Sequence, residues 1–143
     1  MAYKLFLDAN IILDYVLKRK EGYTSARIIF ESIVRGEHQA FTSPVIIHIT
    51  THILRKILGP LQTRKIILAL LNDVQVLNTN HDVVVQAMSA GWSDMEDALQ
   101  YYTALYHKTE VFISRDEKLI KKALPTLPVY QPEQFVLLIG KNE

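Results

Sequence analysis

The chain has 143 residues, 49% of them apolar and 22% charged, which is the composition of a folded globular protein and not of a disordered chain. This length fits one compact core, so we expect residues 1–143 to form a single domain. The formal net charge is only +1, so nucleic acid binding would need a local basic patch. The absence of cysteine excludes disulfides, zinc knuckles and thiol nucleophiles.

The apolar segments are too short to form the apolar region of a signal peptide or a membrane-spanning helix. Asp8 interrupts the N-terminal apolar segment, so the apolar region of a signal peptide is missing. Later apolar runs, such as residues 66–71, are far shorter than the roughly 20 residues needed to span a bilayer. We therefore expect a cytoplasmic protein with no membrane partner.

Short apolar runs alternate with longer amphipathic segments along the whole chain. Such alternation predicts the α/β class, with a parallel sheet covered by helices on both faces. The strands are expected at residues 4–7, 40–42, 74–77 and 111–113, with a terminal extended piece near Val129. The sequence thus predicts a three-layer α/β/α fold with a twisted parallel sheet of about five strands.

Capping and helix-breaking residues predict where the helices begin and end. Asn10 is expected to cap the first helix. Ser43 followed by Pro44 begins a later helix, because serine caps free N–H groups and proline lacks only an N–H that has no partner there. Gly59 and Pro60 end that helix. Further helices are expected at residues 24–34, on both sides of the strand 74–77, at 94–107 and at 118–124.

Acidic residues occur where two of the predicted strands end. Asp8 directly follows the first strand, and Asp116 comes three residues after the strand 111–113. Asp94 and Asp97 share one face of a third segment, at the start of a helix. Carboxyl ends of parallel strands lie at one edge of the sheet, where ligands bind. Clustered carboxylates repel one another unless a cation such as Mg²⁺ or Mn²⁺ binds them, so this pattern predicts a metal-dependent phosphoryl-transfer site.

Helix capping is the alternative explanation for each acidic residue taken alone. Asp8 and Asp116 could cap the helices that follow them. Ser93 and Glu96 fit a capping box, in which Asp94 and Asp97 would complement the helix dipole. Capping does not, however, require acidic residues from three segments to meet at one edge of the sheet.

Residues 6–14, 94–100 and 112–116 resemble, in order, the three acidic motifs of the PIN-domain ribonucleases, most closely those of bacterial VapC-type toxins. Residues 127–135 are similar to the C-terminal stretch of that family. The resemblance implies a twisted parallel sheet between helices, a Mg²⁺ or Mn²⁺ cofactor and endonucleolytic cleavage of single-stranded RNA. It also implies catalytic roles for Asp8, Asp97 and Asp116, a metal site made of these three residues with Asp94, and supporting roles for Asn10 and Ser114.

The chain departs from the family pattern at Ile49, where relatives usually carry glutamate, and no acidic residue lies between Glu37 and Asp73. One consequence could be a catalytically weakened PIN fold that serves as a binding module. His52, one turn further along the predicted helix, is a second candidate ligand, although imidazole suits Mg²⁺ poorly. His48 and His52 lack a third ligand nearby in sequence, which favours partly buried or surface histidines.

The segment from His38 to Asn72 is locally basic. Its four charged residues are Arg55, Lys56, Arg64 and Lys65. They could contact the phosphates of RNA or an acidic segment of an antitoxin, or they could simply keep two apolar helices soluble. The family resemblance implies such an antitoxin partner, and we expect a homodimer.

Overall fold

A five-stranded parallel sheet forms the centre of the computed structural model, which describes residues 1–141. The strand order is β3-β2-β1-β4-β5, and every neighbouring pair is parallel. The strands are β1 (Lys4–Leu7), β2 (Gln39–Thr42), β3 (Val74–Val76), β4 (Val111–Ile113) and β5 (Val129–Tyr130). The predicted α/β class and the five-stranded parallel sheet are therefore confirmed.

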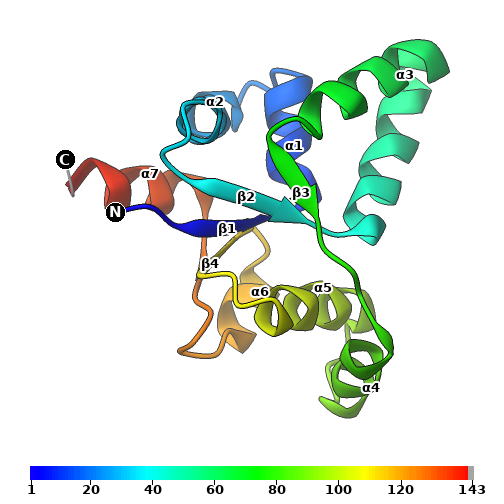
Figure 1. Cartoon of the computed structure of the whole chain (residues 1–143), viewed down its shortest axis with the longest axis vertical. Helices are drawn as coiled ribbons and strands as arrows, with labels where there is room; N and C mark the ends of the chain where they lie inside the picture. The colour runs from blue at the N-terminus through cyan, green and yellow to red at the C-terminus, as the bar shows by residue number, and fades with distance from the viewer. Residues whose placement is uncertain (142–143) are drawn as a thin grey trace.

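Helices cover both faces of this sheet (Figure 1). Helices α1, α2, α3 and α7 lie on one side, and α4, α5 and α6 lie on the other (Figure 1). Their bounds are α1 (Ala9–Val16), α2 (Tyr23–Val34), α3 (Pro44–Leu70), α4 (His81–Ser89), α5 (Met95–Tyr106), α6 (Glu117–Lys122) and α7 (Pro132–Lys141). No helix within residues 1–141 has both the length and the apolar character needed to cross a bilayer.

The two central strands are buried on both faces. Leu5, Phe6 and Leu7 of β1 are fully buried, and the ring of Phe6 lies 4.9 Å from that of Phe112 on β4. Strands covered by helices on both sides have apolar residues at every position instead of an alternating pattern. This is why short, continuous apolar runs were a sufficient signal for the sheet.

Helix α3 is broken where the sequence predicts an end. Gly59 has φ +81°, in the left-handed region that favours glycine, and Pro60 begins the second helical segment. Ser43 caps α3 by accepting the N–H of Ile46, as expected. The bend, near the middle of α3, is the part of this helix farthest from the sheet, so the two segments form an arm that projects from the body (Figure 1).

The structure corrects the predicted cap of the first helix and adds a helix that was not predicted. Asp8, not Asn10, caps α1, because β1 ends at Leu7 and the Asp8 carboxylate accepts the N–H of Ala9. Asn10 is an exposed residue within α1. Helix α7 was not predicted, although Pro132 occupies its first position and the Gln134 side chain accepts the N–H of Gln131, as in a capping box.

Candidate active site

Asp8 and Asp116 lie together because β1 and β4 are neighbours that end in register. Leu7 pairs with Ile113, and the N–H of Asp8 donates to the carbonyl of Ile113 at 3.2 Å. The hydroxyl of Ser114 donates to Asp8 Oδ2 at 2.7 Å and accepts the N–H of Asp116 at 3.1 Å. Ser114 thus connects the acidic residue that follows β1 to the one that follows β4.

The N-terminus of α5 brings two further acidic residues to this edge. Asp94 Oδ1 accepts the N–H of Asp97 at 3.0 Å, so Asp94 caps α5. The predicted capping box of Ser93 and Glu96 is therefore wrong, because α5 begins one residue later than that box requires. The carboxyl group of Asp97 lies within hydrogen-bonding reach of the carboxyl group of Asp116. Acidic residues from three separate segments therefore meet at one edge of the sheet.

A polar stripe on α5 attaches the helix to the strand ends. The hydroxyl of Ser43, directly after β2, donates to Gln100 Oε1, and the hydroxyls of Thr79 and Thr103 lie 2.7 Å apart. Gln100 and Thr103 follow Asp97 at three-residue intervals, so all three lie along one side of α5. The sequence analysis missed this anchoring role, for which the spacing of polar residues within an otherwise apolar helix is the signal.

The four acidic residues influence one another electrostatically. Burial raises the pKa of Asp8, although hydrogen bonds from Ser114 and from the backbone of Ala9 act in the opposite direction. Burial, the hydrogen bond with Asp116 and the negative charges of Asp116, Asp94 and Asp8 raise the pKa of Asp97 to about 7. Asp97 therefore keeps its proton to a much higher pH than an ordinary aspartate does.

The acidic group offers oxygen atoms of the kind that bind a divalent cation. Oδ2 of Asp97 is buried and has no hydrogen-bond donor, and no ion pair within residues 1–141 involves Asp8, Asp94, Asp97 or Asp116. Oxygen ligands of this kind are those that Mg²⁺ and Mn²⁺ prefer. Within residues 1–141, however, no three His, Asp or Glu side chains lie in an arrangement that could hold a metal ion. The assignment of the ligands therefore stays a prediction.

The remaining sequence-predicted residues lie away from these contacts. The exposed Asn10 makes no side-chain hydrogen bond within the described residues, and its supporting role stays a prediction. Ile49 is half-buried and packs against the hydrophobic core. His48 and His52 are exposed on α3, and the described residues place no third ligand with them. The four basic residues Arg55, Lys56, Arg64 and Lys65 are all exposed on the projecting arm of α3.

An ion-pair network behind the acidic group was not predicted. Arg115, between Ser114 and Asp116, pairs with the buried carboxylate of Asp14 on α1 and with Glu133 on α7, the latter at 3.0 Å. Gly22 packs so closely that a Cβ atom there would overlap the Asp14 carboxylate. The network ties the loop that carries Ser114 and Asp116 to two helices on the other side of the molecule.

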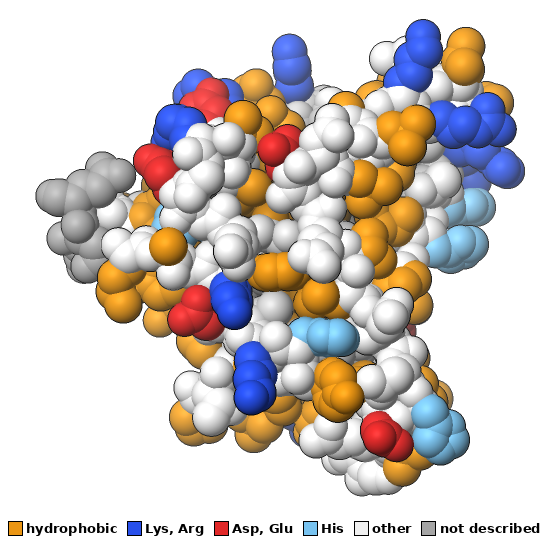
Figure 2. Space-filling model, in the orientation of Figure 1, with side chains coloured by type: hydrophobic (Ala, Val, Ile, Leu, Met, Phe, Trp, Pro, Cys, Tyr) orange, Lys and Arg blue, Asp and Glu red, His pale blue; other side chains and the backbone are white. Residues whose placement is uncertain are grey.

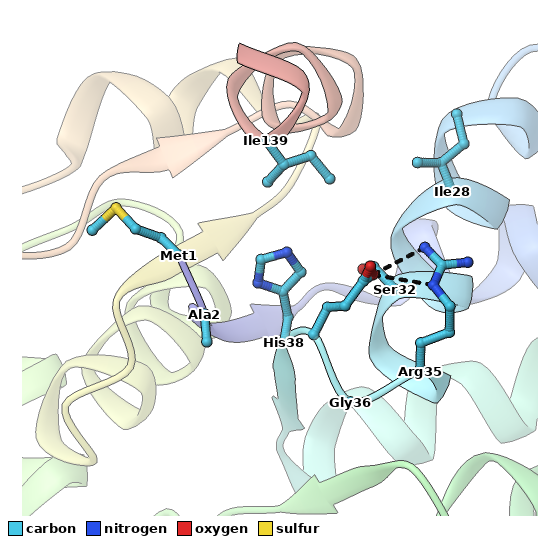
Figure 3. Close-up of a pocket in the computed structure, with 9 residues that line it drawn as sticks. Met1, Ala2, Ile28, Ser32, Arg35, Gly36, His38 and Ile139 are labelled. Carbon is cyan, nitrogen blue, oxygen red and sulfur yellow. Dashed lines mark hydrogen bonds and ion pairs between the residues drawn. The ribbon is translucent and has the colours of Figure 1, made fainter. Parts of the chain in front are cut away.

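A separate pocket of about 440 Å³ lies at the opposite edge of the sheet (Figure 3). Met1 and Ala2, before β1, and His38, before β2, line it together with residues of α2 and α7. Nδ1 of His38 accepts the N–H of Tyr3 at 3.0 Å, and burial lowers the pKa of His38. Arg35 is paired with Glu37 in its wall (Figure 3). The pocket contains none of the acidic site residues and faces the amino ends of the strands.

The acidic group should make the metal-free protein less stable as the pH rises. The pKa of Asp97 in the fold, about 7, lies above its ordinary value of 3.8, so protonation stabilises the fold fully below about pH 4, and this stabilisation is lost as the pH rises through about 7. Asp97→Asn should raise the melting temperature at pH 8 and flatten its decline between pH 5 and pH 8. Calorimetric melting curves with a chelator present test this. An unchanged pH dependence in Asp97→Asn would contradict the assignment.

The Arg115 network should contribute strongly to stability. Arg115→Gln leaves the Asp14 carboxylate buried without its main partner and should destabilise the fold by about 3 kcal/mol. This is the low end of the usual loss for a buried ion pair, because Arg19 remains 3.7 Å from Asp14. The matched control is Arg27→Gln, which removes an exposed pair with Glu31 and should cost less than about 0.5 kcal/mol. Urea unfolding of both variants measures these losses. If both variants lose the same small free energy of unfolding, the network is unimportant for stability.

Ile49→Glu tests whether this position of α3 faces the acidic residues. If it does, the added carboxylate should tighten Mn²⁺ binding measurably and lower the melting temperature of the metal-free protein, because another like charge must be accommodated. Calorimetric titration with Mn²⁺ and melting curves in chelator provide both readouts. Unchanged Mn²⁺ affinity would show that residue 49 points away from the site.

Known proteins share this fold. A sequence model of the PIN domain family matches residues 4–118. No curated protein sequence matches the chain. Among solved structures, VapC20 of Mycobacterium tuberculosis, described as a toxin that cleaves the sarcin-ricin loop, superposes with a TM-score of 0.67 at 14% identity, covering 87% of this chain and 98% of that one.

Two structures from toxin-antitoxin systems are also similar. A toxin-antitoxin complex from Klebsiella pneumoniae gives a TM-score of 0.66 at 19% identity, covering 90% of this chain and 97% of that one. VapBC2 of Rickettsia felis, bound to a DNA fragment from its promoter, gives a TM-score of 0.65 at 12% identity, covering 90% of this chain and 98% of that one. At these identities the structural likeness establishes the shared fold.

Proposed function

We propose that this chain, which belongs to the PIN-domain family, is a metal-dependent endoribonuclease that cleaves single-stranded RNA. The observation that carries the proposal is the meeting of Asp8, Asp97 and Asp116, from three segments, at the carboxyl edge of a parallel sheet. Helix capping explains the position of each acidic residue alone, but it does not explain why they lie together at the expense of mutual repulsion. A site for a cation and a phosphodiester does explain this arrangement.

Asp8, Asp97 and Asp116, with Asp94 beside them, would hold Mg²⁺ or Mn²⁺. Such a cation, when bound, lowers the pKa of a water molecule and stabilises negative charge on a phosphate oxygen. Ser114 orients the site by fixing Asp8 through its hydroxyl and Asp116 through its backbone N–H. The Oδ2 atom of Asp97, which is buried and has no hydrogen-bond donor, would face the cation.

A catalytically weakened binding module is the second candidate, and Ile49 favours it. An apolar, half-buried side chain stands where the family usually has a fourth acidic ligand. Asp94, which caps α5 through Oδ1 only, offers a second carboxylate oxygen that could compensate. The two candidates differ in one measurable property, which is metal-stimulated cleavage of RNA.

The projecting arm of α3 is the proposed surface for RNA or for an antitoxin. Its exposed basic residues Arg55, Lys56, Arg64 and Lys65 gather beside exposed apolar side chains at the bend (Figure 2). No ion pair within the described residues uses these four cations. The toxin-antitoxin complexes among the structural neighbours support an antitoxin partner. We further propose that the protein is cytoplasmic, forms a homodimer and acts as a toxin.

Cleavage of a labelled single-stranded RNA in Mn²⁺ or Mg²⁺ tests the proposed activity. Chelator should stop cleavage, and Asp8→Asn should reduce it by about 100-fold or more, because a metal ion contributes several kcal/mol to such reactions. Asparagine is also a good helix cap, so the melting temperature should change little. Cleavage that survives chelator or Asp8→Asn would contradict the mechanism, and fully folded protein without any cleavage would favour the binding module.

A further inference from the structure

A small cleft adjoins the acidic residues between the start of α5 and helix α6. Its volume is about 30 Å³, which admits one or two groups the size of a water molecule and excludes a nucleobase. A larger ligand must therefore contact its rim. We call this small cleft the α5–α6 cleft. It is lined by Trp92, Ser93, Asp94, Asp97, Lys118, Leu119 and Lys122.

The α6 side of the cleft supplies positive charge. Lys118 and Lys122 are one helical turn apart, so both lie along the side of α6 that faces the cleft. Leu119 is buried and anchors α6 in the core. Both lysines are exposed, and no ion pair within residues 1–141 involves them, even though Asp94 and Asp97 line the same cleft. Their ammonium groups are therefore available to another anion.

An RNA substrate needs such cations at this place. Its phosphates must approach four carboxylates, which repel them, and a cation between the acidic residues offsets only part of this repulsion. Lysine side chains on the rim attract the backbone at the point where it approaches the acidic residues. The basic arm of α3 lies on the other side of the sheet and is a separate surface (Figure 1).

An aromatic ring lines the same cleft as the lysines. The indole of Trp92 is held by ring contacts with Tyr101 at 5.4 Å and Tyr102 at 5.7 Å, and it lines the cleft. A rigid aromatic side chain beside lysines is the combination by which proteins hold single strands, because bases stack on the ring while cations follow the backbone. In double-stranded RNA the bases are already stacked and paired, so this contact favours single strands.

We propose that the rim of the α5–α6 cleft is a binding subsite for single-stranded RNA. In this subsite Lys118 and Lys122 bind a backbone phosphate next to the scissile one, and Trp92 stacks against a neighbouring base. The inference rests on the proposed ribonuclease function and specifies where its substrate enters.

Binding of a fluorescent single-stranded oligoribonucleotide to the inactive Asp8→Asn protein, followed by anisotropy at several salt concentrations, tests the subsite. Adding Lys118→Gln and Lys122→Gln should weaken binding by about tenfold or more. The slope of log K against log salt should fall by about 0.7, since one phosphate contact to a single strand is lost. Adding Trp92→Leu should weaken binding by about tenfold without changing this slope, and it should not affect a double-stranded RNA of equal length.

Lys121→Gln is the matched control, because Lys121 is an exposed lysine of α6 that does not line the cleft. It should change affinity by less than about twofold. In the active protein, the double lysine variant should raise KM about tenfold and leave kcat within about twofold. If the lysines serve only to neutralise the acidic residues, their loss will instead tighten Mn²⁺ binding and change kcat.

The subsite is overturned if the double lysine variant binds RNA like Lys121→Gln, or if Asp8→Asn protein binds no RNA at any salt concentration. Failure of the subsite alone leaves metal-dependent cleavage intact in the otherwise unchanged protein. Failure of the proposed function appears separately, as cleavage that is insensitive to chelator and to Asp8→Asn.

Discussion

Mutual repulsion among Asp8, Asp97 and Asp116 is the constraint on which the arrangement of this molecule depends. Burial raises the pKa of Asp97 to about 7, and the hydrogen bond with Asp116 and the negative charges of its neighbours add to that rise. Other contacts of the fold offset the free-energy cost of this repulsion and leave the acidic residues little freedom to separate. The register of β1 with β4 fixes Asp8 beside Ser114, the Ser114 hydroxyl bridges Asp8 and Asp116, and the polar stripe of α5 attaches Asp97 to the strand ends. A cation would convert this repulsion into attraction.

Helix capping and site formation use the same side chains. Asp8 caps α1, Asp94 caps α5 and Asp116 caps α6, so the amino ends of three helices converge on the acidic edge. Backbone N–H groups at these ends carry partial positive charge and offset part of the repulsion. The two explanations considered for the acidic residues are therefore complementary. Capping fixes where each carboxylate lies, and the parallel sheet decides that the carboxylates lie together.

Local and periodic signals predicted the sheet and the acidic edge, because buried parallel strands are continuous apolar runs and their carboxyl ends share one edge. The same signals could not predict the tie between Arg115 and Asp14, which are distant in sequence and are brought together only by packing of the β4–α6 loop against α1. The helix cap predicted at Asn10 lies two residues earlier, at Asp8, and the cap predicted at Ser93 lies one residue later, at Asp94, because each place offers more than one capping residue within a short stretch. The direction of Ile49 stays a prediction because each residue turns a helix by about 100°, so a family position does not by itself fix what the side chain faces.

The location of a bound metal ion tests this account most directly. Crystals of the protein soaked in Mn²⁺ can be examined by anomalous scattering at the manganese edge. We expect one strong peak at the carboxyl edge of the sheet, with carboxylate oxygens of at least two of Asp8, Asp97 and Asp116 about 2.1 Å away. A peak elsewhere, or a fully ordered acidic edge without manganese at saturating concentration, would contradict it.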